Sequence, residues 1–313
     1  MKRSALIALT ALTALIGPAI ADEAAAKTKI YVSIAKTNDR FIDILSGAVS
    51  QAAGNDPDID LTLVNANNDG QTQLNQVRDA IAAHADAIVI LGVDGKTEVA
   101  AGNMAAAGKV PLVFLNRLPP ADRFAGKVSI VSSNDLVAGR LQMRLIADKL
   151  HGAGNIVILR GEEGHPAAAQ RTQGVKEILA EQPGIHLIEE ATGNWQRDQG
   201  EQLITKWLAS GEHIDAILCN NDEMAIGAIN ALKKAKIPAG KVLVAGVDGT
   251  PDGLDAIRGG YLTLSLLQNA KAQGAQSLVD AKKFADHQYA DFYDWVPYEL
   301  ILPSNVEQYA KAN

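Results

Sequence analysis

The chain has little cysteine and few aromatic residues. Its 313 residues include one cysteine, Cys219, and Phe, Trp and Tyr make up only 4%. A single thiol cannot form a disulfide within the chain. Because Cys219 ends the apolar run "AILC", we expect a buried, unreactive thiol. The sequence therefore excludes a small disulfide-bonded scaffold and disfavours cysteine catalysis.

The chain also lacks an excess of basic residues. Lys and Arg total 29 against 36 Asp and Glu, which gives a formal net charge of -7. Without a basic stripe, nucleic acids and anionic membrane surfaces are not expected partners. The 47% hydrophobic content over this length suffices for two globular domains and is too high for a disordered chain.

The common cofactor and catalytic motifs are missing as well. No Gly-x-Gly-x-x-Gly follows the first apolar run, and there is no Walker loop and no Gly-x-Ser-x-Gly. The six histidines do not pair at a metal-ligand spacing. We therefore predict no cofactor, no metal and no catalytic residue. A hydrolase built from Asp39, Asp248 and His165 stays an alternative, although no pattern positions a nucleophile.

The one long apolar run lies at the amino terminus. Lys2 and Arg3 precede the largely apolar run 5–16, and the triplet Ala19-Ile20-Ala21 follows. This order is typical of a secretory signal peptide, and the run is too short to span a bilayer. We expect cleavage after Ala21 and export to the periplasm. Because no cysteine stands at the cleavage point, a lipid-anchored form is not predicted.

Apolar and helical patterns alternate along the rest of the chain. Strand-like runs cover residues 29–35, 59–66, 87–92, 110–116, 155–161, 185–191, 216–221 and 242–249. Helical patterns lie between them, and the rhythm restarts after residues 128–135. Near-continuous apolar strands alternating with helices predict an α/β fold with parallel sheets covered on both faces. We expect two doubly wound lobes, with a short crossing near Ser132 acting as a hinge.

Polar and aromatic side chains follow almost every predicted strand. In open α/β sheets, ligands bind outside the carboxyl ends of the strands. Amides, carboxylates and guanidinium groups exchange hydrogen bonds with hydroxyls, and aromatic rings suit the C–H faces of a ring. This set matches a sugar or a cyclitol. Taken singly, Asp and Asn are common turn and cap residues, and Asp222 and Asp252 are candidates for helix caps.

Several segments resemble one family. The segments "NNDEMAIGA" and "GVDGTPDG" are similar to ribose-binding proteins, and "VFLNRLP", "GEEGHPAAAQRT" and "GNWQRDQ" are similar to glucose/galactose-binding proteins. The chain thus resembles the type I periplasmic sugar-binding proteins of ABC importers over essentially its whole mature length. LacI-type repressors share the fold, but the export signal and the missing helix-turn-helix disfavour that role.

The resemblance implies lobe boundaries and a binding site. The N-terminal lobe would comprise residues 22–132 plus 268–298, and the C-terminal lobe residues 133–267 plus 299–313. Phe41 and Trp195 would sandwich a ring. The groups that would bind its hydroxyls are Asp39, Asn116, Arg117, His165, Arg171, Asn221, Asp248 and Gln268. In this scheme Asn221 is a ligand amide, and Asp222 caps or supports the helix that follows.

The chain departs from both subgroups at four positions. Ala167 stands where the hexose binders have Asp, Gln268 replaces their Asn, and Asn116 and Ile42 replace an Asp and a Phe of the ribose binders. The calcium loop of the glucose/galactose binders has no counterpart between residues 138 and 155. Hexose, pentose and inositol-like cyclitol all stay open, although Asn116 with His165 favours a six-membered ring.

The resemblance also implies a mechanism and partners. Ligand would enter between the lobes, hinge closure would bury it, and the closed form would dock on a permease in the inner membrane. We expect a monomer, and a chemoreceptor is a further candidate partner. The alternatives are a secreted carbohydrate-active enzyme and a sugar sensor that serves a chemoreceptor alone.

Overall fold

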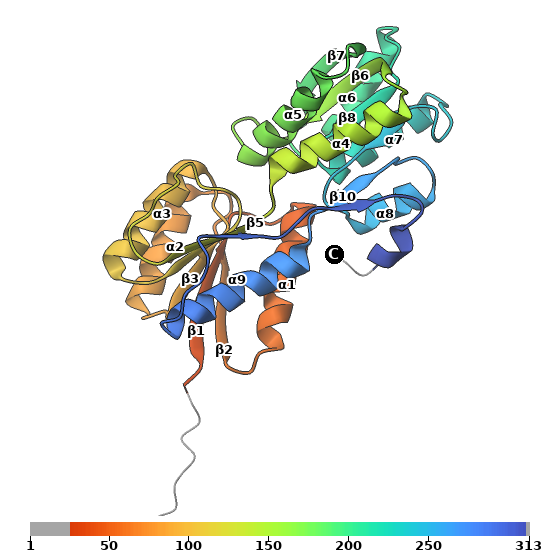
Figure 1. The fold of residues 1–313 in the computed structure, drawn as a ribbon. Helices are drawn as coiled ribbons and strands as arrows, with labels where there is room; N and C mark the ends of the chain where they lie inside the picture. The colour runs from red at the N-terminus through yellow and green to blue at the C-terminus, as the bar shows by residue number, and fades with distance from the viewer. Residues whose placement is uncertain (1–25, 311–313) are drawn as a thin grey trace, which may run out of the picture.

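The computed structural model describes residues 26–310, and the predicted signal peptide lies outside them. Two α/β lobes lie side by side, and the chain passes between them near β5 and β10 (Figure 1). This architecture confirms the α/β class and the parallel sheets expected from the sequence. Within the described part of the chain, no helix has the length and apolar character needed to cross a bilayer.

The first lobe contains a parallel six-stranded sheet in the order β11-β5-β4-β3-β1-β2. Strand β3 is entirely apolar and buried, and so is β4 up to its last residue, Asn116, as expected for strands covered on both faces. The strands are β1 (Thr28–Ile34), β2 (Ile59–Asn65), β3 (Ala87–Ile90), β4 (Leu112–Asn116), β5 (Val128–Ser132) and β11 (Tyr293–Trp295).

Two pairs of helices cover this sheet. Helices α1 (Arg40–Gly54) and α9 (Ala270–Ala285) share one core with one face of the sheet, through residues such as Leu45 and Leu278. Helices α2 (Gly70–Ala82) and α3 (Gly95–Gly108) cover the other face, through residues such as Val77 and Ala101. Residues 268–298 were assigned to this lobe through the family resemblance, but the helix α9 and the strand β11 within them were not predicted.

The second lobe contains a parallel four-stranded sheet in the order β7-β6-β8-β9. Its strands are β6 (Ala153–Arg160), β7 (Gly184–Thr192), β8 (Ala216–Cys219) and β9 (Leu243–Ala245). Helices α4 (Asp135–Lys149) and α5 (Pro166–Leu179) pack on one face. The other face is covered by α6 (Arg197–Ala209), α7 (Asp222–Lys234) and α8 (Pro251–Arg258). Cys219 is fully buried in the latter core, as expected.

A small antiparallel pair completes this lobe. Strands β10 (Ser265–Leu267) and β12 (Glu299–Ile301) pair with each other, and the bridge between Asp248 and Leu267 joins β10 to the segment after β9. A 3-10 helix, Val306–Tyr309, follows. The chain changes lobes in three short segments, after β5, after β10 and after β11 (Figure 1).

Hydrogen bonds tie the crossings to one another. The Ser133 hydroxyl donates to the carbonyl of Val296 at 2.7 Å, and the Val296 amide donates to Ser132 at 2.8 Å. The side chain of Gln273, in α9, donates to the Ser133 hydroxyl at 2.9 Å. All three groups are buried or nearly so. The crossings therefore form one connected hinge rather than independent linkers.

Candidate functional site

All ten predicted site residues line a single cleft between the lobes. Ile42 and Ala167 complete its lining, and both were identified from the sequence only as departures from the subgroups. Most of these residues follow the carboxyl ends of strands of the two parallel sheets, whereas Arg171 lies within α5 and Gln268 follows β10 of the antiparallel pair. The cleft is narrow, with a cavity volume of about 50 Å³. Their role in holding a ligand stays a proposal.

The N-terminal lobe contributes a helix start to the cleft. Asp39 is the N-cap of α1, and its Oδ1 accepts a hydrogen bond from the Ile42 amide at 3.2 Å. Its Oδ2 lies 3.4 Å from the Lys36 ammonium. Phe41, in the first turn, is only 8% exposed and belongs to the core of the lobe. The helix start thus fixes a carboxylate and an aromatic ring next to each other at the cleft.

Asn116 and Arg117 close the end of β4. Asn116 has a left-handed backbone, with φ of 69°, and its amide donates to Gln273 Oε1 at 3.0 Å. Arg117 Nη1 donates to the carbonyls of Gly92 and Val93, the latter at 2.9 Å. Burial lowers the pKa of Arg117 from its usual range, while Glu98 and other carboxylates oppose that shift. The guanidinium is therefore held rigidly under the cleft and pre-aligned for hydrogen bonding.

His165 and Trp195 face each other from the C-terminal lobe. Their rings meet edge to face with centroids 5.1 Å apart. Burial, followed by the charges of Arg117, Arg171 and Lys36, lowers the pKa of His165 to about 2, so the imidazole is neutral. Because its Nδ1 accepts from the Ala167 amide at 3.2 Å, the proton resides on Nε2. His165 is thus a neutral hydrogen-bond donor.

Trp195 occupies a tightly fitted position. A Cβ at Gly161 would lie 2.1 Å from Trp195 Cζ2, so only glycine leaves room for the indole there. Trp195 itself has φ of 65°, an uncommon backbone for a large residue. It also packs against the core beneath α7. The indole is therefore a fixed wall of the cleft that also contributes to the stability of the lobe.

The corner after β8 differs in one respect from the sequence-based expectation. Asn221, not Asp222, is the N-cap of α7, because Asn221 Oδ1 accepts from the Met224 amide at 3.0 Å. The candidate caps at Asp222 and Asp252 are therefore wrong, since Thr250 caps α8, whereas the alternative that Asp222 supports the helix is confirmed. One residue further on, the side chain of residue 222 points into the lobe rather than along the helix axis.

Asp222 instead supports the corner from within. It is fully buried and accepts hydrogen bonds from the Thr250 amide at 2.8 Å, the Thr250 hydroxyl at 3.2 Å and the Ser265 hydroxyl at 2.7 Å. These bonds join the start of α7 to the start of α8 and to β10. Asn221 keeps its Nδ2 near the cleft, where it donates to the Trp195 carbonyl at 3.3 Å.

Arg171 is the centre of a buried network at the hinge. Its Nε donates to Asp135 at 2.7 Å, its Nη2 donates to Gln268 at 3.0 Å and to Tyr298 at 2.9 Å, and its Nη1 donates to the carbonyl of Asn220. Asp135, Gln268 and Tyr298 each lie at a different crossing. Arg171 therefore clamps all three crossings to α5, and every nitrogen of its guanidinium is engaged.

Asp248 links this network to the cleft. Its Oδ1 lies 3.6 Å from Arg171 Nη1, and its backbone φ of 120° is in the range that favours glycine. Burial raises the pKa of Asp248 well above its ordinary value, although Arg171 opposes the shift. The carboxylate is held where it can accept a hydrogen bond from a ligand hydroxyl.

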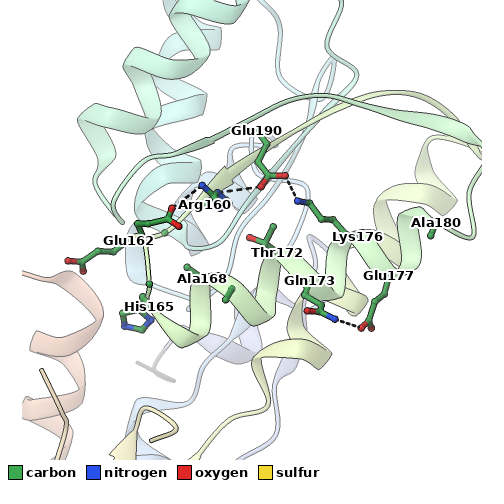
Figure 2. Close-up of a pocket in the computed structure, with 14 residues that line it drawn as sticks. Arg160, Glu162, His165, Ala168, Thr172, Gln173, Lys176, Glu177, Ala180 and Glu190 are labelled. Atoms are coloured by element: carbon green, nitrogen blue, oxygen red, sulfur yellow. Dashed lines mark hydrogen bonds and ion pairs between the residues drawn. The ribbon is translucent and has the colours of Figure 1, made fainter. Parts of the chain in front are cut away.

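A larger groove lies on the outer side of the C-terminal lobe, beside α5 and β7. Its volume is about 530 Å³. Figure 2 shows Glu190 between Arg160 and Lys176, at 3.4 and 2.7 Å, and Gln173 donating to Glu177 at 3.0 Å. The charged groups in this groove thus have partners within it or, for Glu162 and Glu177, just outside it at Lys36 and Arg140, and the groove offers no convergent set like that of the cleft. Within residues 26–310, no group of three His, Cys, Asp or Glu side chains could hold a metal ion.

The family is decided by a match over most of the chain. Residues 30–288 match the model of the periplasmic binding protein domain. The chain belongs to the periplasmic binding protein family. This membership confirms the family resemblance of the sequence motifs, and the matched region contains the whole cleft.

Individual family members match over nearly their full length. A protein of Rhizobium meliloti named "Putative rhizopine-binding protein" is 37% identical over 287 residues, which cover 91% of this chain and 93% of the relative. An ABC transporter solute-binding protein from Bacillus halodurans, solved with bound myo-inositol, is 36% identical with a TM-score of 0.87, covering 92% of this chain and 99% of that one. One from Actinobacillus succinogenes, solved with D-allose, is 26% identical with a TM-score of 0.84, covering 90% and 100%.

The support beneath the cleft of this periplasmic binding protein was not predicted. Asp135 and Tyr298 hold Arg171, and the carbonyl of Asn220 accepts a hydrogen bond from it, yet none of the three was given that role from the sequence. Tyr298 lies 127 positions from Arg171 in the chain. No local pattern signals such a contact. Only the position of Asp135 directly after the predicted crossing gave a usable hint.

Proposed function

We propose that the protein captures a monosaccharide or a cyclitol in the interlobe cleft and delivers it to an ABC permease. The observation that carries this proposal is the convergence of ten predicted residues from both lobes on one cleft. Two aromatic rings offer apolar faces, while amides, carboxylates, guanidinium groups and a neutral imidazole offer hydrogen bonds. A polyhydroxylated ring uses both kinds of group.

The narrow cleft supports a hinge mechanism. A cavity of about 50 Å³ is far smaller than the roughly 300–1,000 Å³ of a typical ligand pocket, so a ring bearing several hydroxyls enters only if the lobes separate. Lys36 and Glu162, from opposite lobes, lie 3.8 Å apart at the cleft. The closed arrangement gives a ligand both sets of contacts at once. Ligand would therefore shift the population toward closure.

Two of the solved relatives support a cyclitol or a hexose as the ligand. The Bacillus halodurans structure holds myo-inositol, and the Actinobacillus succinogenes structure holds D-allose. His165 donates through Nε2, and Asp39 and Asp248 accept, so opposite edges of a ring would meet donors and acceptors alternately. Phe41 and Trp195 would contact its two faces. We propose a cyclitol or a hexose ahead of a pentose.

Export and partners complete the proposal. Relatives of this chain are periplasmic binding proteins, which supports the periplasm as its location. Cleavage after Ala21, a monomeric state, docking on a permease and contact with a chemoreceptor are each proposed on the sequence alone. Amino-terminal sequencing of the exported protein tests the first, because a chain retaining Met1 would contradict cleavage.

A thermal-shift screen with hexoses, pentoses, polyols and cyclitols tests the function directly. A ligand at a hundredfold excess over its dissociation constant stabilises a protein by about 2.7 kcal/mol. We expect a clear upward shift with at least one six-membered ring. The ligand recovered afterwards should be chemically unchanged, and a product would instead identify an enzyme. The absence of any shift across the panel would contradict sugar or cyclitol capture.

A further inference from the structure

A buried glutamine stands behind the cleft residue Asn116. Gln273, in α9, is fully buried and lies outside the lining of the cleft. Its Oε1 accepts a hydrogen bond from Asn116 Nδ2 at 3.0 Å, and its Nε2 donates to the Ser133 hydroxyl at 2.9 Å. One side chain therefore connects a residue of the cleft with the first crossing between the lobes.

This series of hydrogen bonds ends on a group that can only accept. The Ser133 hydroxyl donates its single hydrogen to the carbonyl of Val296 at 2.7 Å. A backbone carbonyl has no hydrogen to donate, so the direction of this bond is fixed. Ser133 is fully buried and Val296 is nearly so, and a carbonyl left without a donor there would cost free energy. The hydroxyl oxygen is thus left as the acceptor for Gln273.

The fixed end sets the orientation of both amides. Because the Ser133 hydroxyl has already used its hydrogen, Gln273 must present its NH2 group to Ser133. The oxygen of Gln273 then meets Asn116, which must present its own NH2 group in turn. The oxygen and the nitrogen of an amide point in different directions. Engaging Asn116 Nδ2 with Gln273 therefore leaves Oδ1 for the cleft that Asn116 lines.

The shape of an amide alone would not decide this orientation. The oxygen and the NH2 group are nearly equal in size, so half a turn of the side chain exchanges an acceptor for a donor at almost the same place. Without Gln273, Asn116 could therefore accept a hydrogen bond from a ligand or donate one to it. The hydrogen bond from Asn116 to Gln273 removes that freedom.

We propose that Gln273 is a positioning residue that makes Asn116 a hydrogen-bond acceptor only, so that the cleft selects a ring with a hydrogen-bond donor at the position facing Asn116. The inference rests on the proposed function, because Asn116 can select only if the cleft holds the ring. A hydroxyl is accepted at that position, whereas a fluorine, an ether oxygen or a carbonyl is rejected. Rejection follows because the Asn116 oxygen would stay unpaired in the closed cleft.

The test compares parent rings with their fluorinated derivatives. Titration calorimetry on the full mature chain measures the affinity for myo-inositol and D-allose. The same measurement follows for their monodeoxy-monofluoro derivatives, substituted at each ring position in turn, because fluorine donates no hydrogen bond. Asn116→Ala identifies the position that faces Asn116, since it lowers the ratio of parent to fluoro affinity at that position alone. There we expect the wild type to bind the fluoro derivative about five- to a hundredfold more weakly than the parent.

Variants on α9 locate the cause of the preference. Gln273→Met keeps most of the side-chain volume and offers Asn116 only a thioether, a weak acceptor. The amide can then turn its NH2 group to the fluorine, and the ratio at that position should fall about fivefold or more. Gln273→Glu keeps an oxygen acceptor for Asn116 and should retain the ratio. Gln276→Met removes hydrogen bonds to Asp280 and Asp294, which lie outside the cleft lining, and should leave the ratio unchanged.

A merely structural role for Gln273 would give a different pattern. A loss of stability lowers the affinity for every ring alike and leaves the ratio of parent to fluoro affinity unchanged. Parent rings that bind to Gln273→Met with an unchanged ratio would therefore overturn the inference and spare the proposed function. Should this variant fail to fold, Ser133→Ala removes the next bond and should lower the same ratio, and an unchanged ratio would overturn the inference equally. Binding of no parent ring to the wild type would overturn both.

Discussion

Removing the guanidinium of Arg171 should destabilise the protein more than any other single change to an arginine of the C-terminal lobe. Arg171→Met keeps most of the side-chain volume and deletes four described hydrogen bonds, to Asp135, Asn220, Gln268 and Tyr298. The side chains of Arg171 and Asp135 are only 4% and 6% exposed. The change therefore leaves a buried carboxylate without its counter-charge.

The expected loss is about 3–5 kcal/mol in the free energy of unfolding, the range measured when one partner of a buried ion pair is removed. Summing the hydrogen bonds separately would overestimate the loss, because groups in one network do not contribute additively. A loss of this size changes the unfolding equilibrium by about two to three and a half powers of ten. Urea unfolding, followed by circular dichroism at pH 7, measures it.

A matched control exists on the neighbouring helix. Arg140 pairs with Glu177 at 2.6 Å, a distance like that of the buried pair, but the two side chains are 41% and 34% exposed. Arg140→Met should cost far less than Arg171→Met, because solvent screens such pairs. Equal stabilities for the two variants would show that burial does not decide the strength of the Arg171 network, and the hinge argument would fail.

Further changes separate the groups around the cleft. Trp195→Ala should weaken ligand binding, measured by calorimetry, about tenfold or more. Trp295→Ala, on a partly exposed edge strand, should leave binding unchanged. Equal effects of the two variants would contradict a stacking role for Trp195. Asn221→Asp keeps the cap acceptor and removes the amide donor, so affinity should fall without a lower melting temperature. Asp222→Ala should lower the free energy of unfolding by about 3 kcal/mol and leave ligand affinity largely unchanged. A loss of affinity in Asp222→Ala together with a loss of stability in Asn221→Asp would contradict the roles given to the two residues. Burial raises the pKa of Glu98 from 4.5 to about 7. The free energy of unfolding of the wild type should therefore fall by up to about 3 kcal/mol as the pH rises from 4.5 to about 7. Urea unfolding of Glu98→Gln over the same pH range should not show this fall.

The fold was predictable because its signals are local. Strand runs such as residues 87–92 are apolar throughout, and the helices between them begin at Asp or Asn caps such as Asp39 and Asp94. Such patterns need no knowledge of distant contacts. Helix α9 and strand β11 escaped prediction because their partners, α1 and β5, lie more than a hundred positions earlier in the chain.

The site was predictable in part for the same reason. Carboxyl ends of parallel strands meet at one edge, so residues following different strands converge even when the sequence separates them widely. The role of each side chain at this edge was harder to predict from the sequence than its position. Asn221 and Asp222 are adjacent and similar in size, yet one caps α7 and the other joins α7 to Thr250 and Ser265. That division depends on whether a side chain points along the helix axis or into the lobe.

Strained backbone at the cleft also lay beyond prediction. Asn116, Trp195 and Asp248 all have positive φ, at 69°, 65° and 120°. Such conformations cost free energy and persist only where the surrounding structure enforces them. Gly161 leaves room for the indole of Trp195, and Gln273 holds the amide of Asn116. Neither contact is visible in a local sequence pattern, because each joins residues that are far apart in the chain.

The two buried arginines show how the cleft and the hinge are joined. Arg117 donates to carbonyls of its own lobe, at Gly92 and Val93, so it moves with that lobe as a unit. Arg171 instead donates to groups at the crossings, and it also lies 3.6 Å from the cleft carboxylate of Asp248. A ligand hydroxyl that binds Asp248 therefore contacts a side chain that already interacts with Arg171, the residue that joins the three crossings. Such shared contacts are the physical link through which ligand binding can bias a two-state hinge.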